Sequence, residues 1–175
     1  LSLRTRDEIT YAASKRLFAL ARSPKKLLHL NPQQVETAIY PVAFYRNKTI
    51  SLFEICRSLV NENKGMVPDS LEKLLRLRGV GRKTANLTLV LGHNKLGICV
   101  DIHVHRIMNR WGYVKTNSPD DTEMELRHKL PKRYWMEINN LLVSFGQNIC
   151  KPQSPYCSKC GILEHCEQIG VNRYR

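Results

Sequence analysis

Helical periodicity runs through almost the whole sequence and limits the fold more than any other feature. Apolar residues recur three and four positions apart, for example at Ile9, Ala13 and Leu17, which places them on one face of a helix. No alternating apolar and polar run flanked by hairpin dipeptides appears, so strands are not expected. The sequence therefore predicts an all-α protein of about nine or ten short helices.

Capping residues mark where several of these helices should begin and end. Ser23, Asn31 and Ser118 each precede a proline, a pattern in which the side chain accepts a backbone N–H bond and the proline takes the first helical position. The stretch HNKLGI, residues 93–98, is the expected crossing between two domains, residues 1–95 and 96–175. Glycines that follow apolar stretches predict three helix ends, at Gly92, Gly112 and Gly146.

The net charge points to a polyanionic partner. Lys and Arg number 28 against 15 Asp and Glu, which gives a formal charge of +13. Such an excess on 175 residues favours nucleic acid. No apolar run approaches the length of about 18 residues that spans a bilayer, and no signal-peptide pattern opens the chain, so we expect a soluble, intracellular protein. No heptad pattern or large apolar face stands out, so we expect a monomer. Because the chain enters a helical pattern directly from Leu1, residues upstream are expected to be missing.

Residues 71–91 have the pattern of two helices joined by a tight turn, Arg78-Gly79-Val80-Gly81. Glycines allow backbone angles closed to other residues and let a second backbone come close. The second helix starts with N–H groups that have no partner within the helix, and such an end binds phosphate without reading base sequence. An ordinary helix–helix corner uses glycine equally well, so the turn alone leaves both interpretations open.

Lys83 falls in the first turn of that second helix, which is an unusual place for a structural lysine. The positive end of the helix dipole opposes its charge and favours the neutral amine. The neighbouring Arg82 acts in the same direction, and a neutral amine is what a nucleophilic lysine needs. These residues alone do not separate a nucleophile from a solvated lysine or one that contacts phosphate.

Asp101 follows the apolar stretch GICV and precedes a helical pattern, so its simplest role is to cap that helix. A carboxylate held at a helix start is also placed to face a cationic intermediate or to move a proton. His103 and His105 complete an Asp-x-His-x-His pattern, but on a helix His105 shares a face with Asp101 and His103 does not. We therefore expect no metal here and interpret the histidines as packing or phosphate contacts.

Four of the six cysteines lie in the last 26 residues of a chain without a secretion signal, which indicates a metal rather than disulfides. The spacing C-x6-C-x2-C-x5-C is formed by Cys150, Cys157, Cys160 and Cys166. Four thiolates suit tetrahedral zinc or an iron–sulfur cube, and the spacing leans toward the cube without deciding. Lys151 and Lys159 lie in the same loop, where they could contact DNA phosphates. The other two cysteines, Cys56 and Cys99, have apolar neighbours and are expected to be buried.

Together these motifs resemble the endonuclease III family, the helix-hairpin-helix glycosylases with a glycine-proline-aspartate region. LRGVGRKTAN resembles the family's hairpin and catalytic lysine, VDIHVHR its catalytic aspartate segment, and the cysteine spacing its [4Fe-4S] loop. Three motifs in the right order are more specific than any one of them. The resemblance spans essentially the whole chain. It implies two α-helical lobes, a six-helix barrel-like domain and a domain with the [4Fe-4S] cluster, with double-stranded DNA bound in a cleft between them.

The resemblance also implies a reaction. Lys83 would attack C1′ of an extruded damaged nucleotide, the base would leave, and a Schiff base would form. β-Elimination would then cut the strand on the 3′ side of the abasic site, while Asp101 would stabilise positive charge on the sugar or accept protons. This is the activity of a bifunctional DNA glycosylase and AP lyase of base excision repair. The family's usual substrates are oxidised pyrimidines.

The resemblance further assigns DNA contacts. By position, Arg4 and Phe44 correspond to the residues that fill the emptied duplex and wedge the opposite strand. Arg4 stands where glutamine is often found, which leaves the opposite-base preference open, and Arg78 replaces the usual proline of LPGVG. The full set of expected contacts is Arg4, Phe44, Arg78, Gly79, Val80, Gly81, Arg82, His103, Lys151 and Lys159.

Two other functions are compatible with the sequence. A monofunctional glycosylase for mismatched adenine or thymine would keep the fold, but relatives of that kind usually lack a lysine at the position of Lys83. A DNA-binding module with structural zinc or a cluster, or an electron carrier, would need no nucleophile. In a binding module, DNA affinity would survive Lys83→Ala and no covalent complex would form at any stage.

Overall fold

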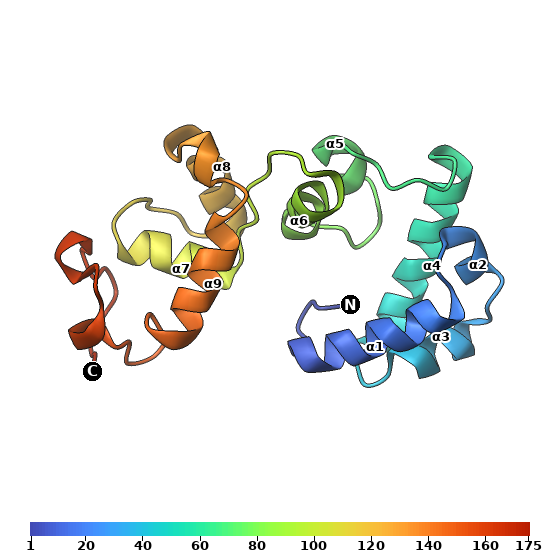
Figure 1. Ribbon diagram of the computed structural model, residues 1–175, viewed down its shortest axis with the longest axis horizontal. Helices are drawn as coiled ribbons and strands as arrows, with labels where there is room; N and C mark the ends of the chain where they lie inside the picture. The colour runs from blue at the N-terminus through green and yellow to red at the C-terminus, as the bar shows by residue number, and fades with distance from the viewer. The chain divides into compact units, whose positions relative to one another are not determined.

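The computed structural model describes all 175 residues and contains nine α-helices and no strand (Figure 1). The prediction of an all-α protein is confirmed. The chain divides into two compact units, residues 1–80 and 81–175. The boundary between these units falls in the glycine turn and not in the stretch 93–98, because α6 (Arg82–His93) forms its contacts with the second unit. The functional domains 1–95 and 96–175 stay a prediction.

The first unit is a helical bundle around one apolar core (Figure 1). The long α4 packs against α2 and α3, and α1 packs against α3. Ala13, Leu17, Val35, Ile39 and Phe53 meet in the core and are all buried. Burying a side chain of the Val, Leu or Phe type contributes about 1.5–3 kcal/mol, so this core holds the bundle together. The helices of this unit are α1 (Asp7–Leu20), α2 (Pro24–Leu28), α3 (Pro32–Ile39), α4 (Tyr45–Glu62) and α5 (Leu71–Leu75).

The second unit is arranged around α7 (Ile102–Arg110), which packs against both α8 and α9. Val104 and Ile107 of α7 are fully buried among Leu126, Trp135 and Leu142. The other elements of this unit are α6, α8 (Pro119–Lys129), α9 (Ile138–Asn148) and short 3-10 helices at Lys132–Tyr134, Cys157–Lys159 and Leu163–His165. None of the helices in either unit is long and apolar enough to cross a membrane.

The three predicted capped prolines begin α2, α3 and α8. The side chains of Ser23, Asn31 and Ser118 each accept a backbone N–H bond from the residue three positions on. Asn31 and Gln34 form a reciprocal pair in which each side chain accepts from the other's backbone. A cap of this kind contributes about 1 kcal/mol, which is why these local patterns identified the helix starts correctly.

Two of the predicted helix ends are wrong. α6 continues through Gly92 and ends at His93, because the next residue, Asn94, has a left-handed conformation with φ 50° that stops the helix. Gly146 lies inside α9, where a Cβ atom would come within 2.8 Å of Cδ2 of His103. Glycine is required there because α9 and α7 approach closely. Gly112, with φ 76°, lies just beyond α7 as predicted.

Candidate active site and cysteine pocket

The glycine turn uses its two glycines differently. Gly79 has φ 74°, and a Cβ atom there would lie 3.3 Å from Oγ of Ser51, so both the backbone angle and the space favour glycine. Gly81 has an ordinary φ of −89° and open space around it. As the N-cap of α6, Gly81 supplies no side chain to accept the first N–H groups of the helix. Such a helix start favours an anion.

Lys83 in the first turn of α6 lies beside Asp101, the N-cap of α7, within the second unit. The distance from Nζ of Lys83 to Oδ2 of Asp101 is 3.9 Å. The lysine side chain is 52% exposed, whereas that of Asp101 is only 9% exposed. The amine is therefore accessible to a molecule in solution, while the carboxylate next to it is held by the protein.

Hydrogen bonds fix the Asp101 carboxylate as an anion. Oδ1 accepts the backbone N–H groups of His103 at 2.8 Å and Val104 at 3.0 Å, and Oδ2 lies 2.9 Å from Nδ1 of His103. Burial acts to raise the pKa of Asp101, but these bonds and the charge of Lys83 outweigh burial, so its pKa is lowered. Because an ionised carboxylate only accepts hydrogen bonds, His103 carries its proton on Nδ1.

Cys99 lies against the backbone of Lys83. It is 3% exposed, and its thiol donates to the carbonyl oxygen of Lys83 at a distance of 3.8 Å. Burial raises the pKa of Cys99 to about 11, with the charge of Asp101 acting in the same direction and that of Lys83 opposing it. Both Cys99 and Cys56 are buried, as the sequence predicted. No sequence pattern indicated that Cys99 contacts Lys83.

Cys99 should make the protein less stable in alkali. A thiol that ionises near pH 9 when unfolded but near pH 11 when folded contributes stability that is fully present below pH 9 and lost as the pH rises through about 11. Two pH units correspond to about 2.7 kcal/mol. The free energy of unfolding, measured in urea, should be higher for the wild type than for Cys99→Ala at pH 8. This difference should shrink by about 2–3 kcal/mol as the pH rises through about 11. An advantage that does not change with pH would contradict this prediction.

Arg4 and Phe44, the predicted duplex-filling residues, lie together in the first unit. The guanidinium carbon of Arg4 is 5.9 Å from the centre of the Phe44 ring. Both residues have left-handed backbones, with φ 55° and φ 58°, and Phe44 is 59% exposed. Non-glycine residues pay a conformational cost in this region, and such outliers are common where a side chain must be presented to a ligand. This arrangement suits a wedge.

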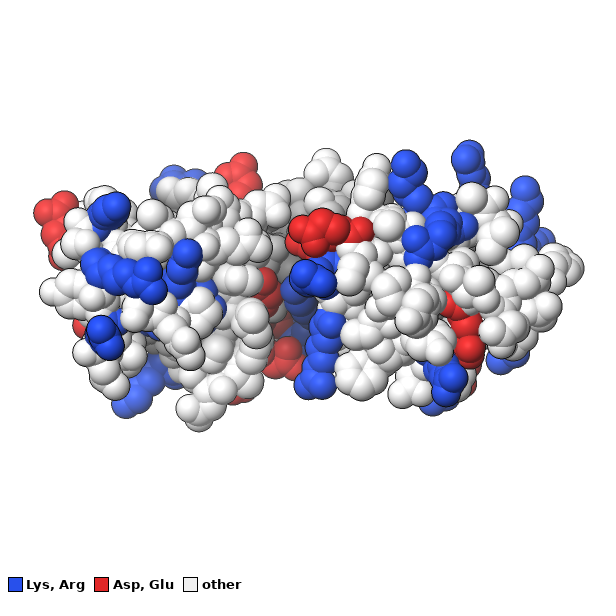
Figure 2. Space-filling model, turned by 90° about the horizontal axis from the view of Figure 1, so that it is seen from below, with Lys and Arg blue, Asp and Glu red and all other residues white.

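The remaining residues predicted to contact DNA differ in their exposure and in whether their side chains already contact other residues. Arg78 is exposed but forms an ion pair with Glu54 of α4. Lys159 is exposed, and Lys151 is half-buried with Nζ 5.0 Å from the centre of the Tyr156 ring. Among the turn residues, Gly79 and Gly81 are exposed, Val80 is half-buried, and the side chain of Arg82 is 25% exposed. Lys and Arg side chains are spread widely over the face in Figure 2, where they outnumber the acidic ones.

The four clustered cysteines line one apolar pocket in the second unit, together with Trp111, Phe145 and Leu163. Burial raises the pKa of the Cys166 thiol, the hydrogen bond from the backbone of Gln168 opposes this effect, and the other three cysteines add to the rise. The backbone N–H of Gln168 donates to Sγ of Cys166 at 3.4 Å. No group of three or more His, Cys, Asp or Glu side chains is arranged to bind a single metal ion directly. A shared pocket and N–H donors aimed at sulfur fit a group held by thiolates.

Two arginines of α7 hold the start of the cysteine loop. The buried Arg110 donates to the carbonyl oxygens of Lys151 and Pro152, both at 2.7 Å, and to Sγ of Cys150 at 3.4 Å. Arg106 donates to the carbonyl oxygen of Cys150 at 2.9 Å. α7 thus has Asp101 as its N-cap and anchors the cysteine loop through two arginines of its C-terminal half. Neither arginine was predicted from the sequence, because nothing in their spacing separates them from surface arginines.

The chain is similar to known DNA repair proteins. Residues 1–132 match the HhH-GPD superfamily of base excision DNA repair proteins. Endonuclease III of Thermotoga maritima is 50% identical over 167 residues, which cover 95% of this chain and 78% of that protein. The chloroplastic endonuclease III homolog 2 of Arabidopsis thaliana is 42% identical over 175 residues, but this chain covers only 45% of its length.

Solved structures show the same fold. A trapped endonuclease III–DNA covalent intermediate superimposes with a TM-score of 0.88 at 32% identity, covering 94% of this chain and 78% of that one. A non-covalent endonuclease III–DNA complex gives the same TM-score of 0.88. A thermostable thymine-DNA glycosylase, at 24% identity and a TM-score of 0.83, shares the fold.

Proposed function

The chain belongs to the endonuclease III family of the HhH-GPD base excision DNA repair proteins, and we propose that it removes oxidised pyrimidines from duplex DNA and cuts the strand through a Schiff base at Lys83. It is thus a bifunctional DNA glycosylase and AP lyase. One observation carries the assignment of the nucleophile. The exposed amine of Lys83 lies 3.9 Å from the buried carboxylate of Asp101, at a helix start that has no side-chain cap.

The reaction follows from these two groups. The lone pair of Nζ attacks C1′, and the bond from C1′ to the base breaks, so the base leaves with the electron pair and takes up a proton. Opening of the sugar ring yields an iminium ion between C1′ and Nζ. Loss of a C2′ proton then expels the 3′ phosphate as the bond from C3′ to oxygen breaks, and water releases the lysine.

Asp101 acts through its fixed negative charge. Its pKa is lowered, so it stays ionised at neutral pH and faces the cationic iminium as that ion forms. Its oxygens accept three hydrogen bonds from His103 and Val104, which hold the carboxylate as an anion beside Nζ of Lys83. We assign to His103 the orientation of this carboxylate in addition to its predicted DNA contact.

The proposed contacts with the duplex have two roles: some position the DNA backbone, and others help to extrude the damaged nucleotide. The uncapped start of α6 and the turn before it bind a phosphate, and Arg78, Lys151 and Lys159 add further charge. Arg4 and Phe44 fill the space left by the extruded nucleotide. Extrusion costs a few kcal/mol and least at damaged pairs, so these contacts help to select damaged sites.

The four cysteines of the pocket, Cys150, Cys157, Cys160 and Cys166, are proposed to hold a [4Fe-4S] cluster. When bound, such a cluster ties four thiolates into one rigid unit. The loop that carries Lys151 and Lys159 is held at its start by Arg106 and Arg110, and it has little regular structure of its own. We infer that the cluster fixes the rest of this loop and so presents its two lysines to DNA.

The function is tested with a duplex that carries one oxidised pyrimidine in a labelled strand. The wild-type protein should release the base and leave a strand cut 3′ to the lesion. Release of the base with an intact strand would favour the monofunctional glycosylase. Binding without release of the base would favour the DNA-binding module. An undamaged duplex of the same sequence serves as the control.

A further inference from the structure

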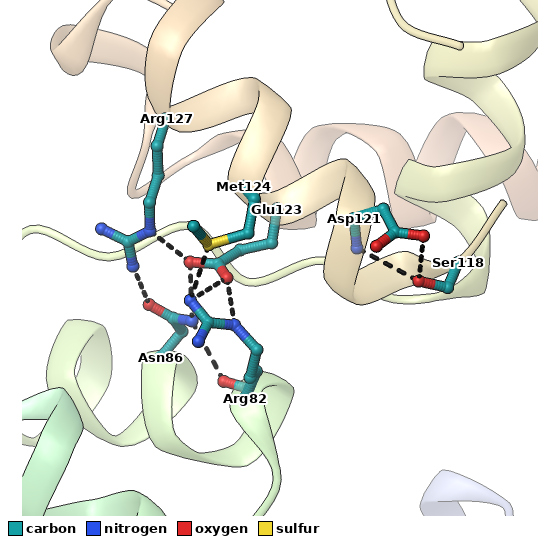
Figure 3. A network of polar contacts seen from close by, with 7 residues as sticks. All are labelled: Arg82, Asn86, Ser118, Asp121, Glu123, Met124 and Arg127. Carbon is teal, nitrogen blue, oxygen red and sulfur yellow. Dashed lines mark hydrogen bonds and ion pairs between the residues drawn. The ribbon is translucent and has the colours of Figure 1, made fainter. Parts of the chain in front are cut away.

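A buried carboxylate outside the reacting groups joins α6 to α8 in the second unit (Figure 3). Glu123 of α8 is 2% exposed, and its two oxygens accept hydrogen bonds from Arg82 of α6 and Arg127 of α8. Arg127 also donates to Oδ1 of Asn86 at 3.0 Å, and Nδ2 of Asn86 donates to the carbonyl oxygen of Arg82 at 3.0 Å. We call these four residues, Arg82, Asn86, Glu123 and Arg127, the Glu123 clamp.

The Glu123 clamp holds α6 on both sides of Lys83. Arg82 directly precedes Lys83, and Asn86 follows one helical turn later. Their partners, Glu123 and Arg127, are likewise one turn apart on α8. The first turn of α6 is therefore bound to α8 at two points, and the backbone of the nucleophile lies between them.

The same segment of α8 also holds α7. Thr122, next to Glu123, is fully buried and forms a hydrogen bond of 2.7 Å with Nδ1 of His105. His105 lies one turn after Asp101 on α7. Two consecutive residues of α8 thus tie down the helix that carries the lysine and the helix that carries the aspartate.

We propose that Glu123 is a positioning residue that sets the separation of Lys83 and Asp101 through Arg82. This inference rests on the proposed lyase function. A 1 Å displacement of reacting groups can lower a rate about a hundredfold, and the clamp is the direct polar link from the start of α6 to α8. Burying a carboxylate is costly unless it is paired, which two arginines and a buried Asn86 achieve here.

The proposal changes the role of Arg82. Its Nε bonds Oε2 of Glu123, and its NH2 group contacts Oε2 and lies 3.3 Å from Sδ of Met124. A guanidinium held in this way is a weak candidate for a phosphate contact, although its neighbour in sequence is the nucleophile. We assign to Arg82 the transmission of the position of Glu123 to Lys83.

The test separates chemistry from binding. Trapping with borohydride on an abasic duplex, with enzyme in excess, measures the rate of Schiff-base formation, and an uncleavable abasic analogue measures Kd at several salt concentrations. Glu123→Gln and Arg82→Gln should lower the trapping rate about tenfold to a hundredfold, with Kd within about threefold of wild type. Arg82→Lys, which keeps a charge for Glu123, should recover part of the rate.

The matched control is the exposed ion pair of α5, Glu72 with Arg76, whose side chains are 77% and 73% exposed. Glu72→Gln and Arg76→Gln make the same chemical changes and should leave the trapping rate unchanged. If Glu123→Gln does not fold, Arg82→Gln still tests the proposal, because Glu123 then keeps Arg127 as its partner.

Other outcomes would overturn the proposal. A folded Arg82→Gln variant that traps at the wild-type rate, but binds more weakly with a salt slope reduced by about one, would make Arg82 a phosphate contact. Trapping at the wild-type rate with only a lower melting temperature would make the Glu123 clamp purely structural. A wild-type protein that never traps would remove the lyase function itself, a failure that the variants do not produce.

Discussion

Lys83→Ala should abolish the covalent complex that borohydride traps between this protein and a duplex with one abasic site. Among Lys83, Asp101 and Cys99, only the lysine has an amine that can form an iminium with C1′, and this iminium is the species that borohydride reduces to a stable bond. Removing a nucleophile lowers rates by at least about three orders of magnitude. The measurement is the fraction of DNA in the covalent band over time.

A measurement of DNA binding by Lys83→Ala should distinguish loss of the nucleophile from loss of the fold. Lys83 is half exposed and has the Asp101 carboxylate, at 3.9 Å, as its charged neighbour, so its truncation should leave Kd for an abasic analogue within about tenfold. Lys25→Ala, at an exposed lysine of α2, is the matched control and should trap like the wild type. A band of normal intensity from Lys83→Ala would contradict the assignment and require another amine.

Cys157→Ser should remove the proposed iron–sulfur cluster and loosen the C-terminal loop. A cluster of this type has four irons and four thiolate ligands, so the wild type should contain about four iron atoms and four sulfides per chain, and the variant less than about one of each. Structural metals contribute on the order of 10 kcal/mol to the domains that they hold, so the urea unfolding midpoint of the second unit should fall strongly. DNA affinity should fall too, because Lys151 and Lys159 lie in this loop.

Cys56→Ser supplies the matched control for this experiment. Cys56 is a buried cysteine of α4 in the first unit, and the same substitution there costs packing but should leave the iron content unchanged. One zinc atom per chain with no iron or sulfide would contradict the cluster and favour the zinc alternative. A full iron content in Cys157→Ser would show that this cysteine is not a ligand.

The helix starts that carry Lys83 and Asp101 were predicted correctly because their signals are local, while the roles of the two residues stay a prediction. The glycine turn, the lysine two residues after Gly81 and the aspartate before α7 each lie within a few residues of the helix end that explains them. Helix starts at Ser23, Asn31 and Ser118 were predicted for the same reason, since a cap acts over three residues.

Predictions that required long-range contacts were less complete. Gly146 matches a helix-ending pattern, but its place is set by His103, 43 positions earlier in the chain, which occupies the space of a side chain. Glu123 on α8 looks like one of several surface acids in sequence, and only packing against α6 buries it between two arginines. Arg82 was predicted to contact DNA because of its charge and position, since the sequence does not show that Glu123 is its partner.

The sequence by itself determined the helical fold and the order of the three motifs, and it predicted Lys83 with Asp101 as the reacting pair and a set of four cysteines as ligands. These depend on periodicity, capping and spacing, which act over a few residues. Only the tertiary structure decided that His103 orients Asp101, that Arg106 and Arg110 anchor the cysteine loop to α7, and that Glu123 joins the helix of Lys83 to α8. These contacts join residues that are far apart in the chain or lie on different faces of a helix. They form only when the helices pack and bury the charged groups together.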